Sequence, residues 1–258
     1  MIKESMAYVV FAATTMALGI LGLVYGDFAL VWQPVPDGLP GRSLLAYLCA
    51  IFMVVTGVGM LFSKSARVAT TALFVYMLLW LVLLKMPALF SAPLVEASWL
   101  GCAETSVQVA GAWVLFARMR DSERGVRAAT VLFGLALIPC GLGHLVYVKQ
   151  TADFVPAWLP GPMMWAYLTG VAYLAAAAAV LSGVLARRAA YLSATMMGVF
   201  TLLVWVLGVC RSPGDRFQWT AMLISLSLTA GAWVVAESYR RRAADAAAPT
   251  TAPTRLAA

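Results

Sequence analysis

The stretch PDGLPGRSLLAYL at residues 36–48 returns as PAWLPGPMMWAYL at residues 156–168. A second stretch, SWLGCAETSVQVAGAWV at residues 98–114, returns as QWTAMLISLSLTAGAWV at residues 218–234. Each copy lies 120 residues after the original, and no gap is needed between the two stretches. The matches cluster at loop and helix-end residues, which composition alone would not align. The sequence therefore predicts a duplicated unit.

The composition is that of a membrane protein. Apolar residues make up 63% of the chain and charged residues 11%, whereas soluble domains carry about 25% charged residues. Crossing a hydrocarbon core needs about 20 apolar residues, and lipid leaves unpaired backbone groups without partners, so the long apolar runs should be helices. The predicted spans are 6–25, 43–62, 68–86, 99–117, 128–147, 163–185, 189–209 and 219–237. We therefore expect an all-α integral membrane protein with eight transmembrane helices, whose surroundings are the lipid bilayer.

Basic residues divide unequally between the two ends of these helices. Thirteen lie on one side, namely Lys3, Lys64, Arg67, Arg118, Arg120, Arg124, Arg127, Arg187, Arg188, Arg240, Arg241, Arg242 and Arg255. Five lie on the other, namely Arg42, Lys85, Lys149, Arg211 and Arg216. The positive-inside rule then predicts a cytoplasmic (inner) membrane protein with both termini in the cytoplasm. The net charge of +7 is read as this topology signal and not as a nucleic-acid surface, because it comes in short clusters between apolar runs.

Four helices per unit predict that both units enter the membrane in the same direction, as parallel repeats. The expected organisation is a first unit at 1–117, a cytoplasmic linker at 118–127, a second unit at 128–238 and a disordered tail at 239–258. The tail is rich in Ala, Pro and Thr, which cannot bury a core. The external loops at 26–42 and 149–162 contain too much Pro and Gly to continue a helix, and we expect them to cover the outer face.

Glu104 is the most informative polar residue, because an acid inside a transmembrane helix is costly and must face protein or water. Two roles are open for Glu104: it lines a polar pocket, or it is a buried group that holds two helices together. Lys85 lies at a similar depth in the membrane and is either the counter-ion of Glu104 or a lysine whose ammonium group extends to the membrane interface. His144 lies at a helix end on the same external side, as a pocket residue or as a cap. With Gln108, these residues form the predicted external pocket.

The other reactive residue types give no catalytic pattern. Cys49, Cys102, Cys140 and Cys210 have neither CxxC nor zinc-ligand spacing, so no metal site is expected. All four fall in the external half, where they are buried apolar residues or thiols that an oxidising compartment reaches. We do not expect the chain to be an enzyme on its own.

The repeated unit resembles the DoxX-like membrane protein family. The resemblance is carried by the Pro-rich loop FVPAWLPGPMMWAYLTG at 154–170, the basic turn ARR at 186–188 and the closing GAWV. Residues 128–237 fit best, and the first unit looks like a diverged copy. Some members are membrane subunits of thiosulfate:quinone oxidoreductases and others assist redox or secretion complexes. The resemblance alone implies a quinone as cofactor and membrane or redox proteins as partners, although this chain lacks the paired cysteines of a thiol-exchanging relative.

Three functions remain open at this point. The first is a membrane component that supports a redox or envelope process, with a pocket at Glu104 for a quinone-like or small polar ligand. The second is a transporter whose parallel repeats rock around a central site. The third is a structural or assembly partner without a ligand.

Overall fold

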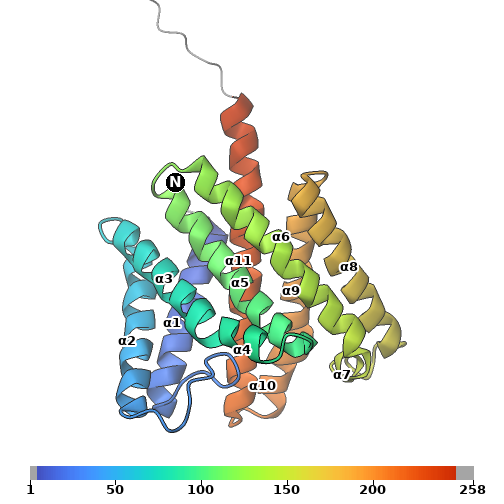
Figure 1. Ribbon diagram of the computed structural model, residues 1–258, viewed down its shortest axis with the longest axis horizontal. Coiled ribbons are helices and arrows are strands. Elements are labelled where there is room, and N and C mark those ends of the chain that lie inside the picture. Colours follow the sequence, from blue (N-terminus) through green and yellow to red (C-terminus); the bar gives the residue numbers. More distant parts are fainter. Residues whose placement is uncertain (1–4, 248–258) are drawn as a thin grey trace, which may run out of the picture.

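The computed structural model describes residues 5–247, with side chains to residue 239, and every regular element in this part of the chain is helical. The elements are α1 (Met6–Tyr25), α2 (Arg42–Leu61), α3 (Ala66–Trp80), η1 (Leu81–Lys85), α4 (Met86–Ser91), α5 (Glu96–Arg118), α6 (Glu123–Val146), α7 (Val148–Asp153), α8 (Pro162–Ser182), α9 (Ala186–Phe200), η2 (Thr201–Val206), α10 (Leu207–Arg211) and α11 (Arg216–Ala247). Figure 1 shows them as one bundle. The elements η1 and η2 are π-helical segments that continue α3 and α9 without a break.

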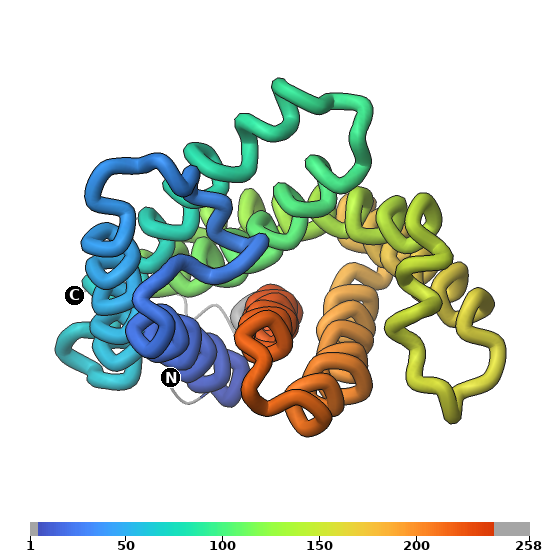
Figure 2. Tube along the Cα trace, turned by 90° about the horizontal axis from the view of Figure 1, so that it is seen from below, coloured from blue at the N-terminus to red at the C-terminus, as the bar shows by residue number. Residues whose placement is uncertain are grey.

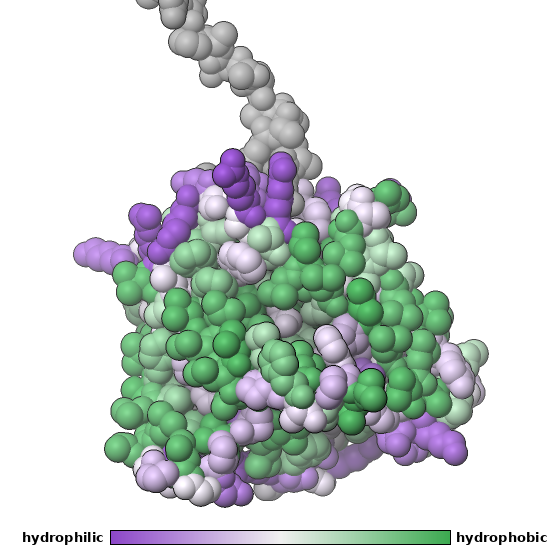
Figure 3. Space-filling view, viewed as in Figure 1, coloured by the Kyte–Doolittle hydropathy of each residue, from purple (hydrophilic) through white to green (hydrophobic). Residues whose placement is uncertain are grey.

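Eight helical stretches in the described part are long and apolar enough to cross a membrane, as predicted. Large apolar side chains are exposed around the bundle, such as Leu44, Val55 and Leu192, which are 66%, 62% and 69% exposed. In Figure 3 hydrophobic side chains cover the middle of the visible face, and hydrophilic ones gather at its ends. Such a surface is typical of a protein whose apolar middle section faces lipid. The chain is a multi-pass membrane protein.

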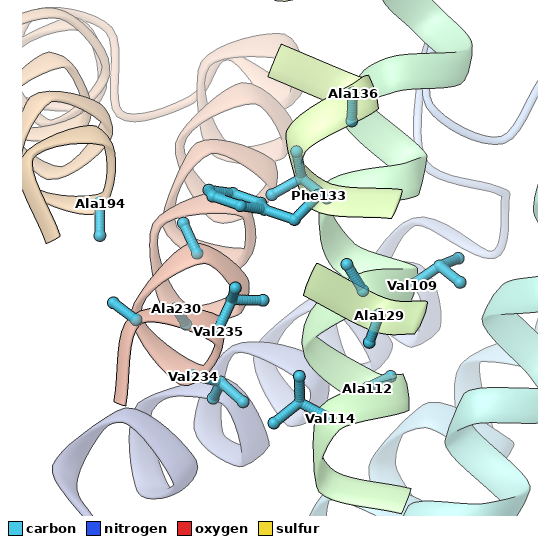
Figure 4. Packing of buried hydrophobic residues seen from close by; sticks show 14 of the residues in the cluster. Val109, Ala112, Val114, Ala129, Phe133, Ala136, Ala194, Ala230, Val234 and Val235 are labelled. Atoms are coloured by element: carbon cyan, nitrogen blue, oxygen red, sulfur yellow. The ribbon is translucent and has the colours of Figure 1, made fainter. Parts of the chain in front are cut away.

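The core lies where α5, α6 and α11 meet. Figure 2 shows α11 inside a ring of helices, and Figure 4 shows small residues and one ring, Phe133, at the contact. Phe133 is fully buried. A Cβ atom built on Gly111 of α5 would lie 2.6 Å from the Cα of Gly231 in α11. The two helices can approach this closely because neither residue has a side chain.

Four pairs of helical elements begin at positions 120 residues apart. Arg42 and Pro162 open α2 and α8, and both follow a glycine with positive φ, 70° at Gly41 and 68° at Gly161. Glycine adopts this conformation without the Cβ clash that other residues meet. The same spacing separates the starts of α3 and α9, of η1 and η2, and of α5 and α11.

The helix bounds differ from the expected local structure at three places. Residues 148–153 form the short helix α7 although we expected an irregular loop, and α6 begins at Glu123 inside the expected linker. The Ser122 hydroxyl accepts a hydrogen bond from the Gly125 amide at 3.2 Å, which caps α6. The tail is also helical to Ala247, since its Ala and Arg residues favour helix. The remainder of the tail lies outside the described residues.

Candidate ligand cavity

A cavity of about 520 Å³ lies between α5, α6, α9 and α11. Its volume falls in the range of about 300–1,000 Å³ that is typical of small-molecule sites. The exposed lining residues Ala97, Gln150 and Phe154 lie at the end of the bundle that holds α4, α7 and α10. The cavity therefore opens at the end that the sequence predicts to be external.

One wall of the cavity is a continuous series of aromatic rings. His144 meets Tyr173 edge to face, with ring centroids 5.4 Å apart. Phe200 lies 6.4 Å from the His144 ring and 6.3 Å from Trp205, and Trp205 lies 5.3 Å from Phe154 near the mouth. All five side chains line the cavity. Such a wall presents flat apolar surfaces on which another ring can stack.

Glu104 lines this cavity from the third turn of α5, about 12 Å along the helix from Glu96. Its side chain is partly exposed to the cavity, and no hydrogen bond to its carboxylate is found within the described residues. Its electrostatic partner is Lys85. A carboxylate at this depth is available to a ligand that brings a hydrogen-bond donor.

Lys85 does not line the cavity but lies behind Glu104. It ends the π-helical segment η1 and is only 9% exposed. Its ammonium donates a hydrogen bond of 3.0 Å to the carbonyl of Val31, in the loop between α1 and α2. Lys85 therefore joins the acid of the cavity to a loop residue that also lines it.

His144 is held in one orientation by Thr169 of α8. Its Nδ1 lies 2.7 Å from the Thr169 hydroxyl, which itself donates to the Trp165 carbonyl at 2.8 Å. Because that hydroxyl proton is used, we assign Nδ1–H as the donor in the neutral ring, and Nε2 keeps its lone pair. The structure thus brings Glu104 and His144 into one cavity from α5 and α6.

Gln108 lies one helical turn below Glu104 and does not line the cavity. Its side chain is fully buried, and neither amide atom has a hydrogen-bond partner among the described residues. The Ser227 hydroxyl in α11 is equally buried and unpaired there. Gln108 is therefore a buried polar residue on the face of α5 that packs into the core.

Sequence reasoning missed the aromatic wall and one acid, Glu96. Trp205 lies in η2 at the position 120 residues after Lys85, and this correspondence was the only available signal for it. Glu96 begins α5 and interacts electrostatically with Glu104. Nothing in the sequence distinguishes Glu96, because a glutamate in the first turn of a helix is common.

The loop between α1 and α2 packs into the bundle and supplies part of the cavity lining. Trp32 of this loop is 6% exposed, packs against Leu18, Met53 and Leu223, and also lines the cavity. Met53 lies 120 residues before Tyr173, another residue of the lining. The loop at 26–41 thus enters the bundle, whereas the expected role for it was a cover over the outer face.

The cysteines occupy different environments. Cys102 and Cys140 are buried, Cys49 is partly buried and Cys210 is exposed, and all four are free thiols. No group of three or more His, Cys, Asp or Glu side chains that could hold a metal ion occurs in residues 5–239.

A quinone fits the residues that line the cavity. The aromatic wall can stack on a planar ring, and Glu104 and the His144 Nε2 atom can accept hydrogen bonds from its hydroxyl groups in the reduced form. Comparisons of the chain with family models, with curated proteins and with solved structures find no match to any of them.

Proposed function

We propose that this chain is a DoxX-like component of the cytoplasmic membrane that binds a small planar ligand of the quinone class and supports a redox or envelope process. The observation that carries the proposal is the cavity, in which a partly exposed Glu104 and an oriented His144 lie beside an aromatic wall. A bound quinone would supply the capacity to take up electrons and protons. The protein would supply the aromatic ring faces, the hydrogen-bond acceptors and exclusion of bulk water.

The proposal includes two parallel four-helix repeats with both termini in the cytoplasm. It is supported by paired details 120 residues apart. The Trp99 indole donates to the Pro93 carbonyl at 2.9 Å, and the Trp219 indole donates to the Pro213 carbonyl at 2.8 Å. The contact between Gly111 and Gly231 lies where a twofold axis between such repeats would pass.

Organic molecules that co-purify in a mild detergent test the proposal. We expect mass spectrometry to find a quinone with the wild-type protein and at least about tenfold less with Glu104→Gln, which keeps the shape of the side chain and removes its charge. Asp153→Asn is the matched control, since Asp153 is an exposed acid of α7 that does not line the cavity. Equal quinone content in a folded Glu104→Gln protein would contradict the role of Glu104.

Titration with a quinone tests whether the aromatic wall of the cavity binds this class of ligand. Menadione, a naphthoquinone without an isoprenoid tail, should quench the tryptophan fluorescence of the detergent-extracted, ligand-depleted protein, and Trp205→Phe should remove much of that quenching. Flux of the same probe into proteoliposomes separates binding from transport. Saturable flux would favour the transporter, and absence of any saturable quenching would favour a structural partner.

A further inference from the structure

A second hollow, of about 780 Å³, lies on the outside of the bundle between η1, α4, α5 and α6, and we call it the lateral groove. Its lining is apolar except for Glu96 and Ser106. The chain beside it exposes apolar side chains, with Phe90 80% and Leu94 98% exposed. The groove therefore faces the lipid.

The lining of the lateral groove suits an acyl chain. Small residues, Ala103 and Ala136, form its buried floor, and long side chains such as Leu89 and Leu135 form its walls. A transmembrane helix about 10–12 Å wide needs small residues across a broad face to approach closely. An acyl chain needs only a narrow apolar channel, and filling it restores the dispersion contacts that a void would forfeit.

Glu96 gives the groove a charge at its outer end. Both of its carboxylate oxygens lie in a buried position with no hydrogen-bond partner among the described residues. A Cβ atom on Gly143 of α6 would lie 3.1 Å from one of them, so the carboxylate lies against α6. The acid Glu104 interacts with it electrostatically, and no cation lines the groove. A buried carboxylate in this setting attracts an ammonium group and repels an anion.

We propose that the lateral groove binds a phospholipid with a primary-amine headgroup, with an acyl chain along α5 and α6 and the ammonium near Glu96. The groove then selects zwitterionic aminolipids over anionic lipids. This inference does not rest on the cavity ligand, since the groove and the cavity are lined by different residues.

Native mass spectrometry of the delipidated protein tests the selectivity. Phosphatidylethanolamine and phosphatidylglycerol with identical acyl chains are added in equal amounts. We expect the wild-type protein to retain roughly two- to fivefold more phosphatidylethanolamine, the range expected for one ion pair with a headgroup that stays in contact with water. Glu96→Gln should remove this preference, and Asp153→Asn, at the same end of the bundle but outside the groove, should keep it.

A second pair of variants tests the groove itself. Leu135 lines the groove and is 51% exposed, so Leu135→Trp can fill it from the rim and should reduce retention of both lipids. Leu192→Trp, on the lipid-facing side of α9, should leave retention unchanged. Equal retention of the two lipids by the wild-type protein, or an unchanged preference in Glu96→Gln, would overturn the proposal. A protein adduct in place of lipid would show that a partner helix occupies the groove.

Discussion

Val31 adopts a conformation that a β-branched residue rarely takes. Its φ is 62°, in the left-handed region, where the Cβ atom crowds the backbone. The hydrogen bond from Lys85 to its carbonyl holds it there, and Lys85 also faces Glu104. At the scale of single residues, a strained loop residue and the acid of the cavity are thus joined through one lysine.

Val31→Gly should stabilise the protein. The Val31 side chain is 76% exposed, so its removal forfeits little burial, and glycine relieves a positive φ that costs about 1–2 kcal/mol. Some of this gain is lost to the larger entropy of the unfolded chain, so the expected net effect is about 1 kcal/mol in the free energy of unfolding. Denaturation in detergent micelles measures it, and a loss of stability would show that the side chain has a packing role.

Lys85→Met should destabilise the protein by about 3 kcal/mol, because it leaves Glu104 without its cation and Val31 without its hydrogen bond. The double variant Lys85→Met/Glu104→Leu should recover part of that loss, since it removes the acid as well. A double-mutant cycle on unfolding free energies measures the coupling. Additive effects would show that the two side chains do not interact.

At the scale of elements, the contact of α5 with α11 has no room for a side chain. A Cβ atom on Gly111 would meet the backbone of Gly231, which cannot rotate away as a side chain could. Gly111→Val should therefore destabilise by at least about 3 kcal/mol, the upper end of the usual cost of overpacking. Gly38→Ala is the control, because nothing lies within 4 Å of the added atom. A stable Gly111→Val protein would show that the two helices can separate.

The loop at 26–41 is tied to the start of α11 by charged groups. Burial alone would raise the pKa of Asp27, but hydrogen bonds from the Phe28 amide and from Arg42 and Arg216 outweigh it, so the pKa lies below its ordinary value. The Arg216 Nη1 atom lies 3.2 Å from Asp27. This end of the bundle therefore depends on an ionised carboxylate.

A lowered folded-state pKa makes the contribution of Asp27 pH-dependent. Its stabilisation is fully present above the unfolded value of about 3.9 and is lost as the pH falls through the lower folded value. Melting temperatures should thus fall below about pH 4 in the wild-type protein, and less steeply in Asp27→Asn. Asp153→Asn is the control, because Asp153 is an exposed acid of α7 at the same end of the bundle. Identical pH profiles for all three proteins would contradict the proposed tie.

At the scale of the whole molecule, the proposed topology places alternate connections on opposite sides. A fluorescent-protein fusion after residue 122 should fluoresce in the cytoplasm, and a phosphatase fusion after residue 92 should be active outside. The reason is the thirteen-to-five division of basic residues. An active phosphatase at residue 122 would rule out parallel repeats with cytoplasmic termini.

The sequence by itself determined the number and positions of the spans, because lipid demands about 20 apolar residues per helix and a Pro- or Gly-rich break between helices. It also singled out Glu104 and His144, since polar groups in apolar helices need a reason to be there. The ends of α6 and α11 were less predictable, because capping and helix propensity are weak local signals.

Only the tertiary structure decided where the cavity lies. Trp32 packs against Leu18, Met53 and Leu223 and also lines the cavity, together with aromatic side chains from α6, α8, α9 and η2 and with Phe154, which follows α7. The path of a loop and the presence of a π-helical segment depend on contacts between residues far apart in the chain. Hydropathy reports the environment of each residue in turn, so it cannot specify where the bundle stays open.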